Sequence, residues 1–133
     1  MNRIMEARAI GRYQHQSPRK IRMAADLIRG KDLEVALNLL HFSNKKSANL
    51  VEKVLRSAVA DLLNTTAGAS TNPEDLYVKS VWIDPGPMVK RYRAGSMGRA
   101  NIIRRRQSHI TVVVTEKPGA AKRKTKEKLN KTK

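Results

Sequence analysis

The chain has 133 residues, and its 28 Lys and Arg against 11 Asp and Glu give a formal net charge of +17. That length fits one folded domain with appendages, and the absence of cysteine excludes a disulfide framework, a thiol nucleophile and a cysteine zinc site. The start of the sequence lacks the apolar core of a signal peptide, and no run of about eighteen apolar residues occurs, so we expect neither signal-directed export nor a membrane span.

The charge is distributed unevenly along the chain. Residues 1–31 carry +6, residues 32–84 carry −2, residues 85–115 carry +7 and residues 116–133 carry +6. The middle therefore has the charge of an ordinary globular surface, whereas both ends and the segment 85–115 are basic. Such segregation indicates a nucleic-acid-binding protein, because a surface charged merely for solubility would spread its cations evenly.

A strand and a helix are predicted in the first thirty residues. Residues 3–12 alternate apolar and polar side chains, which suits a half-buried strand. Ser17 followed by Pro18 is typical of a helix start, and Gly30 is typical of a helix end. The expected inward residues are Met5, Ala7 and Ala9 in the strand and Ile21, Ala24, Ala25 and Ile28 in the helix.

The outer stripe of this helix, which carries Arg19, Arg22, Asp26 and Arg29, has two interpretations. As a solvated face it would hold an Arg22–Asp26 ion pair worth a few tenths of a kcal/mol. Alternatively, it contacts RNA. We expect Arg12, His15, Lys20 and Lys31 to crowd the same end, and this favours the RNA contact.

Two further helices are predicted in the middle of the chain. Asp32 can cap a helix that runs to about Leu40, and Ser43 or Asn44 starts a long third helix that ends within residues 65–68. The long helix is the main core element. The expected inward residues are Val35, Ala36, Leu39 and Leu40 in the shorter helix and Ala48, Val51, Val54, Leu55, Ala58, Val59 and Leu62 in the longer one. Lys45 and Lys46 lie near its start, where they could reach a phosphate.

Two strands, 76–83 and 109–115, are predicted to pair as a long antiparallel hairpin. The prolines within 85–87 mark where the first strand leaves the sheet, because proline cannot donate in the interior of a ladder. In the first strand, one face is expected to carry Val78, Ser80 and Trp82, and the other Tyr77, Lys79, Val81 and Ile83. In the second strand, one face is expected to carry Ile110, Val112 and Val114, and the other His109, Thr111, Val113 and Thr115.

The segment 84–108, here called the finger, joins these two strands. Its arms of roughly ten residues would reach about 30 Å beyond the body. After Asp84 it contains no acidic residue, and it lacks the alternating apolar residues that a protein core would bury. A polyanion is therefore the expected partner of its cations. They are Lys90, Arg91, Arg93, Arg99, Arg104, Arg105 and Arg106, with Tyr92 able to stack on an unpaired base, and the tip is Ala94, Gly95, Ser96, Met97 and Gly98.

No motif for catalysis or metal binding is found in the sequence. A P-loop, an HExxH helix, a dinucleotide-binding glycine turn and clustered carboxylates are all missing. His15, His41 and His109 stand apart from one another and are expected to lie on the surface or to contact phosphates. We therefore expect a protein that is not an enzyme and has neither a cofactor nor a metal site.

Four runs of the sequence resemble the family of bacterial ribosomal large-subunit protein twenty-two. They are SPRKIRMAADLIRGK (17–31), NKKSANLVEKVLRSAVA (44–60), VWIDPGPMVKRYR (81–93) and GRANIIRRRQSHITVVV (98–114). The resemblance extends in order from about Met5 to Glu116. It implies an α+β fold, with three helices packed on a three-stranded antiparallel sheet and a long protruding β-hairpin. Residues 1–116 would form the single domain. The basic tail, 117–133, lies outside the resemblance, and its lack of large apolar residues apart from Leu129 predicts a flexible, disordered segment.

The same resemblance implies a structural role in the large ribosomal subunit, in the cytoplasm. The partners would be large-subunit ribosomal RNA, bound early in assembly, neighbouring large-subunit ribosomal proteins and the nascent peptide, because the hairpin would line the exit tunnel. No membrane and no homo-oligomer is expected. At the tip, which would face the tunnel, many members carry proline and arginines, whereas this chain has Ala94 to Met97. From pattern and resemblance together, the expected RNA-binding residues are Arg8, Arg12, His15, Ser17, Arg19, Lys20, Arg22, Arg29, Lys31, Lys45, Lys46, Lys90, Arg91, Tyr92, Arg93, Arg99, Arg104, Arg105, Arg106 and His109.

Two other classes of function are compatible with a strongly basic chain. One is a free-standing RNA chaperone or DNA-compacting protein, which co-sedimentation with ribosomal subunits would distinguish from a ribosomal component. The other is a basic amphipathic membrane binder. It is disfavoured because the arginines of the finger alternate with small polar residues and form no apolar face.

Overall fold

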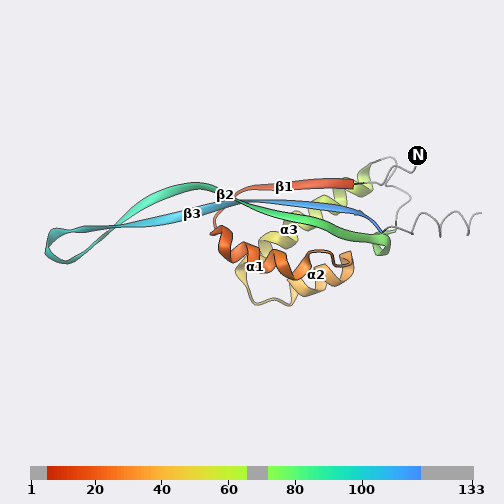
Figure 1. The fold of residues 1–133 in the computed structure, drawn as a ribbon, viewed down its shortest axis with the longest axis horizontal. Helices are drawn as coiled ribbons and strands as arrows, with labels where there is room; N and C mark the ends of the chain where they lie inside the picture. The colour runs from red at the N-terminus through yellow and green to blue at the C-terminus, as the bar shows by residue number, and fades with distance from the viewer. Residues whose placement is uncertain (1–5, 66–71, 118–133) are drawn as a thin grey trace, which may run out of the picture.

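The computed structural model describes residues 6–65 and 72–117 of the chain. Three helices pack on a three-stranded antiparallel sheet from which a long hairpin protrudes, which confirms the predicted fold class (Figure 1). The predicted tail lies outside the described residues except for Lys117. In chain order the elements are β1 (Glu6–Gln14), α1 (Pro18–Ile28), α2 (Leu33–His41), α3 (Lys46–Asn64), a short 3₁₀ turn (Pro73–Asp75), β2 (Leu76–Ala94), a second 3₁₀ turn (Ser96–Gly98) and β3 (Ala100–Glu116).

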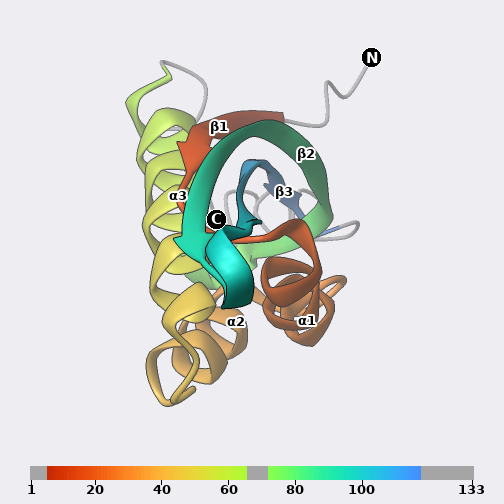
Figure 2. The same cartoon turned by 90° about the vertical axis from the view of Figure 1, so that its left-hand side faces the viewer.

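The sheet has the strand order β1-β3-β2, so β3 is the central strand. β1 pairs with β3 from Glu6↔Thr115 to Gln14↔Ser108, and β2 reaches the same level at Pro85↔Ser108. Beyond Ser108 only β2 and β3 remain, and they form the finger. In Figures 1 and 2, α1 and α2 lie beside β2, toward the edge of the sheet that is farther from β1. α3 packs against β1 and β3.

One hydrophobic core joins the helices to one face of the sheet. The inward residues predicted for α1 are all fully buried, as are Ala48, Val51, Leu55 and Ala58 of α3. Ala9, Ile83, Ile110, Val112 and Val114 supply the sheet side of this core. Gly11 allows β1 to approach α3 closely, since an added Cβ would lie 2.6 Å from Cγ2 of Val54. The periodic apolar patterns of α1 and α3 thus predicted the core correctly.

The prediction for α2 was wrong in part. Val35 and Leu39 are exposed, at 46% and 41%, instead of buried. The helix begins at Leu33 and turns Leu33, Ala36 and Leu40 inward. Its sequence is apolar on nearly every side, so the helical period alone could not decide which stripe faces the core. Packing against α1 and α3 decides it.

The face predicted for Val78 was also wrong. Val78 is buried together with Val81 and Ile83, whereas Trp82 is half-exposed. The cause is a register shift between Val78↔Val114 and Ser80↔Val113, which leaves Lys79 as an extra residue in β2. Such a bulge reverses the alternation of side chains beyond it. Trp82 therefore lies on the sheet face opposite the helices.

Element boundaries differ modestly from the predictions. β1 extends to Gln14 and not to residue 12, and its predicted residues 3–5 lie outside the described residues. α3 begins at Lys46, two to three residues later than predicted. Ser17 and Asp32 stand at the predicted N-cap positions, but neither side chain makes a capping hydrogen bond. Gly30 ends the first helical segment with φ of +72°, a conformation that favours glycine.

The outer edge of β2 in the body is covered by α1 and the residues that follow it. Arg22 donates through Nη2 to the carbonyl oxygen of Ile83 at 3.1 Å, and Arg29 donates through Nη2 to that of Val81 at 3.1 Å. Gly30 and Lys31 exchange backbone hydrogen bonds with Val78. The Arg22–Asp26 pair, which belonged to the alternative of a solvated face, is replaced by a pair of Asp26 with Arg29 at 2.9 Å. Arg22 reaches the strand instead, because its long side chain lies over the edge of β2.

Candidate nucleic-acid interface

A basic hollow of about 600 Å³ lies where the finger meets the body. The β1–α1 turn, the start of α3 and both arms of the finger contribute to it. Its size falls within the range of ligand pockets. The residues that line it are His15, Gln16, Ser17, Lys20, Lys46, Val89, Arg91, Arg104, Arg105, Arg106 and Gln107.

Two hydrogen bonds tie the β1–α1 turn to the base of the finger. The buried hydroxyl of Ser108 donates to the carbonyl oxygen of Gln16 at 3.1 Å. The side-chain amide of Gln107 lies 3.4 Å from Nδ1 of His15. Because these contacts join β3 to the turn before α1, they fix the position of the finger arginines relative to the body.

The electrostatic environment of the hollow is uniformly positive. None of the described residues that line it carries a carboxylate. The N-terminal turn of α1, with Ser17 and Lys20, and the first residue of α3, Lys46, both border it, and neither helix has a side-chain cap. The positive end of a helix dipole favours an anion at such a position. The arrangement is therefore suited to a phosphate group.

Several acidic residues of the body are paired with cations outside the hollow. Glu52 pairs with Arg56 at 2.6 Å, Asp32 pairs with Lys117 at 3.1 Å, and Glu6 pairs with Lys79. These pairs lie on α3, beside α2 and across the sheet. The finger arginines therefore rely on an external anion for neutralisation.

Beyond the hollow, the finger is a twisted two-stranded ribbon (Figure 1). Its paired arm continues from Pro85 to Ala94, which confirms the predicted arm of about ten residues. The pair Lys90↔Arg104 is followed by Tyr92↔Ile102 on the same face, and both rows are exposed. Two-stranded ribbons twist strongly, so cations on successive rows point in different directions. The finger can therefore contact phosphates on more than one side.

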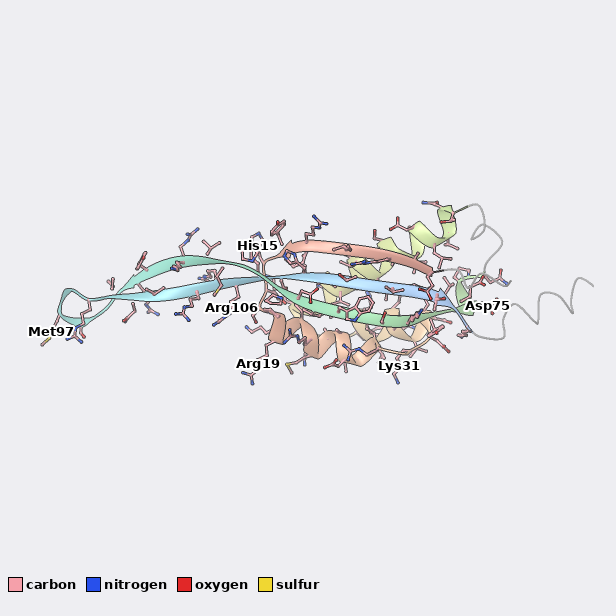
Figure 3. The ribbon with its side chains drawn as sticks, turned by 45° about the horizontal axis from the view of Figure 1, so that its top comes forward. His15, Arg19, Lys31, Asp75, Met97 and Arg106 are labelled. Carbon is pink, nitrogen blue, oxygen red and sulfur yellow. The ribbon has the colours of Figure 1, made fainter. Side chains whose placement is uncertain are left out.

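The tip of the finger is a tight turn. Arg99 donates its N–H to the carbonyl oxygen of Ser96 at 3.2 Å, and the two residues between them, Met97 and Gly98, have φ of +54° and +69°. Two consecutive positive φ values are the pattern of a type I′ turn. The predicted reversal is confirmed, and Met97, 95% exposed, is its outermost large side chain (Figure 3).

Eight of the predicted RNA-binding residues line the hollow, and the others lie elsewhere in the structure. Arg8 and Arg12 are exposed on β1, and His109 lies in the body. The prediction that Lys31 crowds the end with Lys20 was wrong, because α1 separates the two, and Figure 3 shows Lys31 far from His15 and Arg106. The remainder, Arg19, Arg22, Arg29, Lys45, Lys90, Tyr92, Arg93 and Arg99, lie on α1, at the start of α3 or farther along the finger.

Three residues of the hollow were missed by sequence reasoning. Gln16, Val89 and Gln107 are uncharged, so a search for cations could not find them. Gln107 directly follows the three arginines, and Gln16 lies between His15 and Ser17, so proximity to predicted residues was the available signal.

In the described parts of the chain, no group of three or more His, Cys, Asp or Glu is placed to hold a metal ion. Among the described helices, none is both long enough and apolar enough to cross a membrane.

A family model described as Ribosomal protein L22p/L17e matches residues 9–115, a span that includes the whole hollow and the finger. The chain belongs to the L22p/L17e family. The resemblance inferred from the four sequence runs is thereby confirmed.

Several members of the L22p/L17e family are similar over nearly their whole length. The large ribosomal subunit protein uL22 of Halothermothrix orenii is 50% identical over 113 residues, which are 85% of this chain and 97% of that protein. The protein of the same name from Thermus thermophilus is 50% identical over 115 residues, 86% of this chain and 99% of its own length. That of Syntrophobacter fumaroxidans is 47% identical over 113 residues, 85% of this chain and all of that protein.

Proposed function

We propose that this chain is a structural component of the large ribosomal subunit that binds ribosomal RNA at the base of its finger. The observation that carries this proposal is the hollow, where Lys20, Lys46 and the arginines of both finger arms meet without a carboxylate. The similar proteins of the L22p/L17e family are named as proteins of that subunit. The role is structural rather than catalytic, and it is performed in the cytoplasm among other ribosomal proteins.

The mechanism follows from the exposure of the finger, in which β2 and β3 pair with each other and with no third described strand. The arms expose their cations on both faces, so RNA packed around them neutralises the charge and orders the ribbon. The body binds one RNA segment at the hollow while the finger reaches others, which holds segments distant in the RNA sequence together. Recognition is mainly of phosphate geometry and RNA shape, because most of the contacting groups are Lys and Arg.

The finger is further proposed to lie along the wall of the nascent-peptide exit tunnel, as the family resemblance implies. The arms anchor on RNA through Lys90, Arg91, Arg93 and Arg99. The uncharged type I′ tip is then free to face the tunnel space and the passing peptide. A turn without charged side chains suits such a position, because it offers no phosphate anchor of its own.

Co-sedimentation tests the ribosomal assignment. A tagged copy should migrate with large subunits at about one copy per subunit and remain there through a high-salt wash. Recovery mainly in the free cytosolic fraction or with chromosomal DNA would overturn the proposal and favour an RNA chaperone or a DNA-compacting protein.

Shortening the tip should separate tunnel function from assembly. Replacing residues 94–100 by Asn-Gly keeps Arg93 opposite Asn101 and restores a two-residue turn. We expect near-normal amounts of large subunit, because the hollow and most of the arms remain. We expect altered stalling on tunnel-sensing nascent peptides or an altered response to tunnel-binding macrolides, because the finger becomes several ångströms shorter.

The matched control for this variant is Arg99→Ala in a finger of full length, since the replacement also removes Arg99. Subunit profiles and stalling are measured in the same strains. An assembly defect with unchanged stalling would show that the tip anchors RNA and does not face the tunnel.

A further inference from the structure

The sheet face opposite the helices carries an exposed aromatic patch. On this face Thr111 of the central strand β3 pairs with Ile10 of β1 and Trp82 of β2. Trp82 is 51% exposed and Ile10 is 44% exposed. His109 lies two residues from Thr111 on the same strand, and its ring contacts that of Tyr13. Three rings and one isoleucine therefore share one face of the sheet, around Thr111 and His109 of its central strand.

The rings of Tyr13 and His109 are held in place by specific contacts. Tyr13 donates its backbone N–H to Nδ1 of His109 at 3.1 Å. The two rings meet edge to face with centroids 4.9 Å apart and planes at 81°. Tyr13 has φ of +54°, a conformation that residues other than glycine seldom adopt. This side of the patch is thus organised before any ligand binds.

The hydrophobic core between the helices and the sheet does not include Trp82. The bulge at Lys79 turns Trp82, the single tryptophan of the chain, away from the core. A large aromatic side chain left half in solvent, beside other exposed rings, is typical of a binding surface. Such rings are also the groups on which unpaired nucleic-acid bases stack, and sheet faces with exposed aromatic residues recur in RNA-binding domains.

The surroundings favour RNA over a protein partner. Arg8 and Arg12 lie on β1 beside the patch and are exposed, while the carboxylate of Glu6 is neutralised by Lys79. Asp84, the register partner of His109, is the one acid of β2 and lies on the same face. In the sequence only Gln14 separates Tyr13 of the patch from His15, which lines the basic hollow.

We propose that this face is a second RNA contact, at which an unpaired base stacks on Trp82 while Arg8 and Arg12 hold the flanking phosphates. This inference rests on the proposed function and assigns Trp82, Tyr13 and Ile10 a role in it. The ligand is single-stranded or bulged RNA, since bases within a duplex do not expose their faces.

The single tryptophan makes the proposal directly measurable. Trp82 emission should be quenched when the full-length protein binds its cognate large-subunit ribosomal RNA, transcribed in vitro. Trp82→Ala should weaken binding roughly tenfold without changing its salt dependence, because a stacking contact is lost but no phosphate contact. Trp82→Phe should retain most of the affinity. Phe42→Ala removes another exposed aromatic ring, at the end of α2, and should have no effect.

Folding is checked separately by thermal unfolding, and the affinities are compared at a temperature well below the melting temperature of each variant. Unquenched Trp82 emission and a Trp82→Ala affinity within twofold of wild type would overturn the inference, while salt-dependent binding through the hollow would leave the proposed function intact. Loss of a neighbouring ribosomal protein from Trp82→Ala subunits, with unchanged RNA affinity, would also overturn it and identify a protein-binding face. Failure of the wild-type chain to bind the RNA at all would instead contradict the proposed function.

Discussion

Replacing Arg104, Arg105 and Arg106 together by Gln is expected to reduce the slope of log K against log salt by about two to three units. For equal affinities at 1 M salt, this corresponds at 0.1 M salt to an affinity for ribosomal RNA about two to three orders of magnitude weaker. All three arginines line the hollow, and no described carboxylate there can neutralise them, so each is available to one phosphate. The measurement is binding to cognate large-subunit ribosomal RNA at several salt concentrations.

The control for this experiment must change the net charge equally. Lys53, Arg56 and Lys117 lie in the body outside the hollow, and two of them pair with Glu52 or Asp32. Changing these three to Gln should alter the slope by less than about one unit. Equal changes in both triple variants would mean that bulk charge, and not the hollow, governs RNA binding.

The second large effect concerns folding rather than binding. Changing both Arg22 and Arg29 to Met should lower the free energy of unfolding by about 2 kcal/mol, because two guanidinium hydrogen bonds to the carbonyl oxygens of β2 are lost. For a domain of this size the melting temperature should fall by roughly 5 to 10 °C. Met retains the apolar stem of Arg, so the loss is mainly of donors. Urea and thermal unfolding of the isolated protein measure the effect.

Arg19→Met is the matched control, because Arg19 lies on the same helix and makes no hydrogen bond to the strand within the described structure. It should leave the melting temperature within a degree or two. The double variant also tests whether Arg22 and Arg29 contact RNA, as sequence reasoning expected. A reduced salt slope with an unchanged melting temperature would assign both to the RNA interface and contradict the stabilising role.

The helical predictions succeeded where one face of a helix was clearly polar. In α1 the period identified the buried stripe of Ile21, Ala24, Ala25 and Ile28 correctly, while Met23 and Leu27 remain exposed on the outer side. α2 is apolar on several sides, and its inward face depends on neighbouring helices that the sequence does not position. No glycine or proline near Lys79 indicates the bulge in the sequence. The sheet face on which Trp82 lies could therefore be found only in the structure.

The candidate site was predictable in composition but not in geometry. The uncompensated cations of the finger and of the first basic segment were evident from charge alone. Lys46 and Arg104 line the same hollow because of the way α3 packs against the sheet, and the sequence does not reveal this tertiary arrangement. Lys31 was predicted to lie near Lys20 because the two are close in sequence. The intervening helix α1 places Lys31 at the opposite end of the body.

The covered edge of β2 matters before the protein reaches its partner. A newly synthesised copy meets other copies in solution, and an open strand edge would invite them to add strands and aggregate. In the body that edge is occupied by Arg22, Arg29 and the backbone of Gly30 and Lys31. Along the finger, where no helix covers the strands, neighbouring copies would bring arginines against arginines. The two halves of the longest strands are therefore protected differently, by hydrogen bonds in the body and by mutual repulsion of cations along the finger.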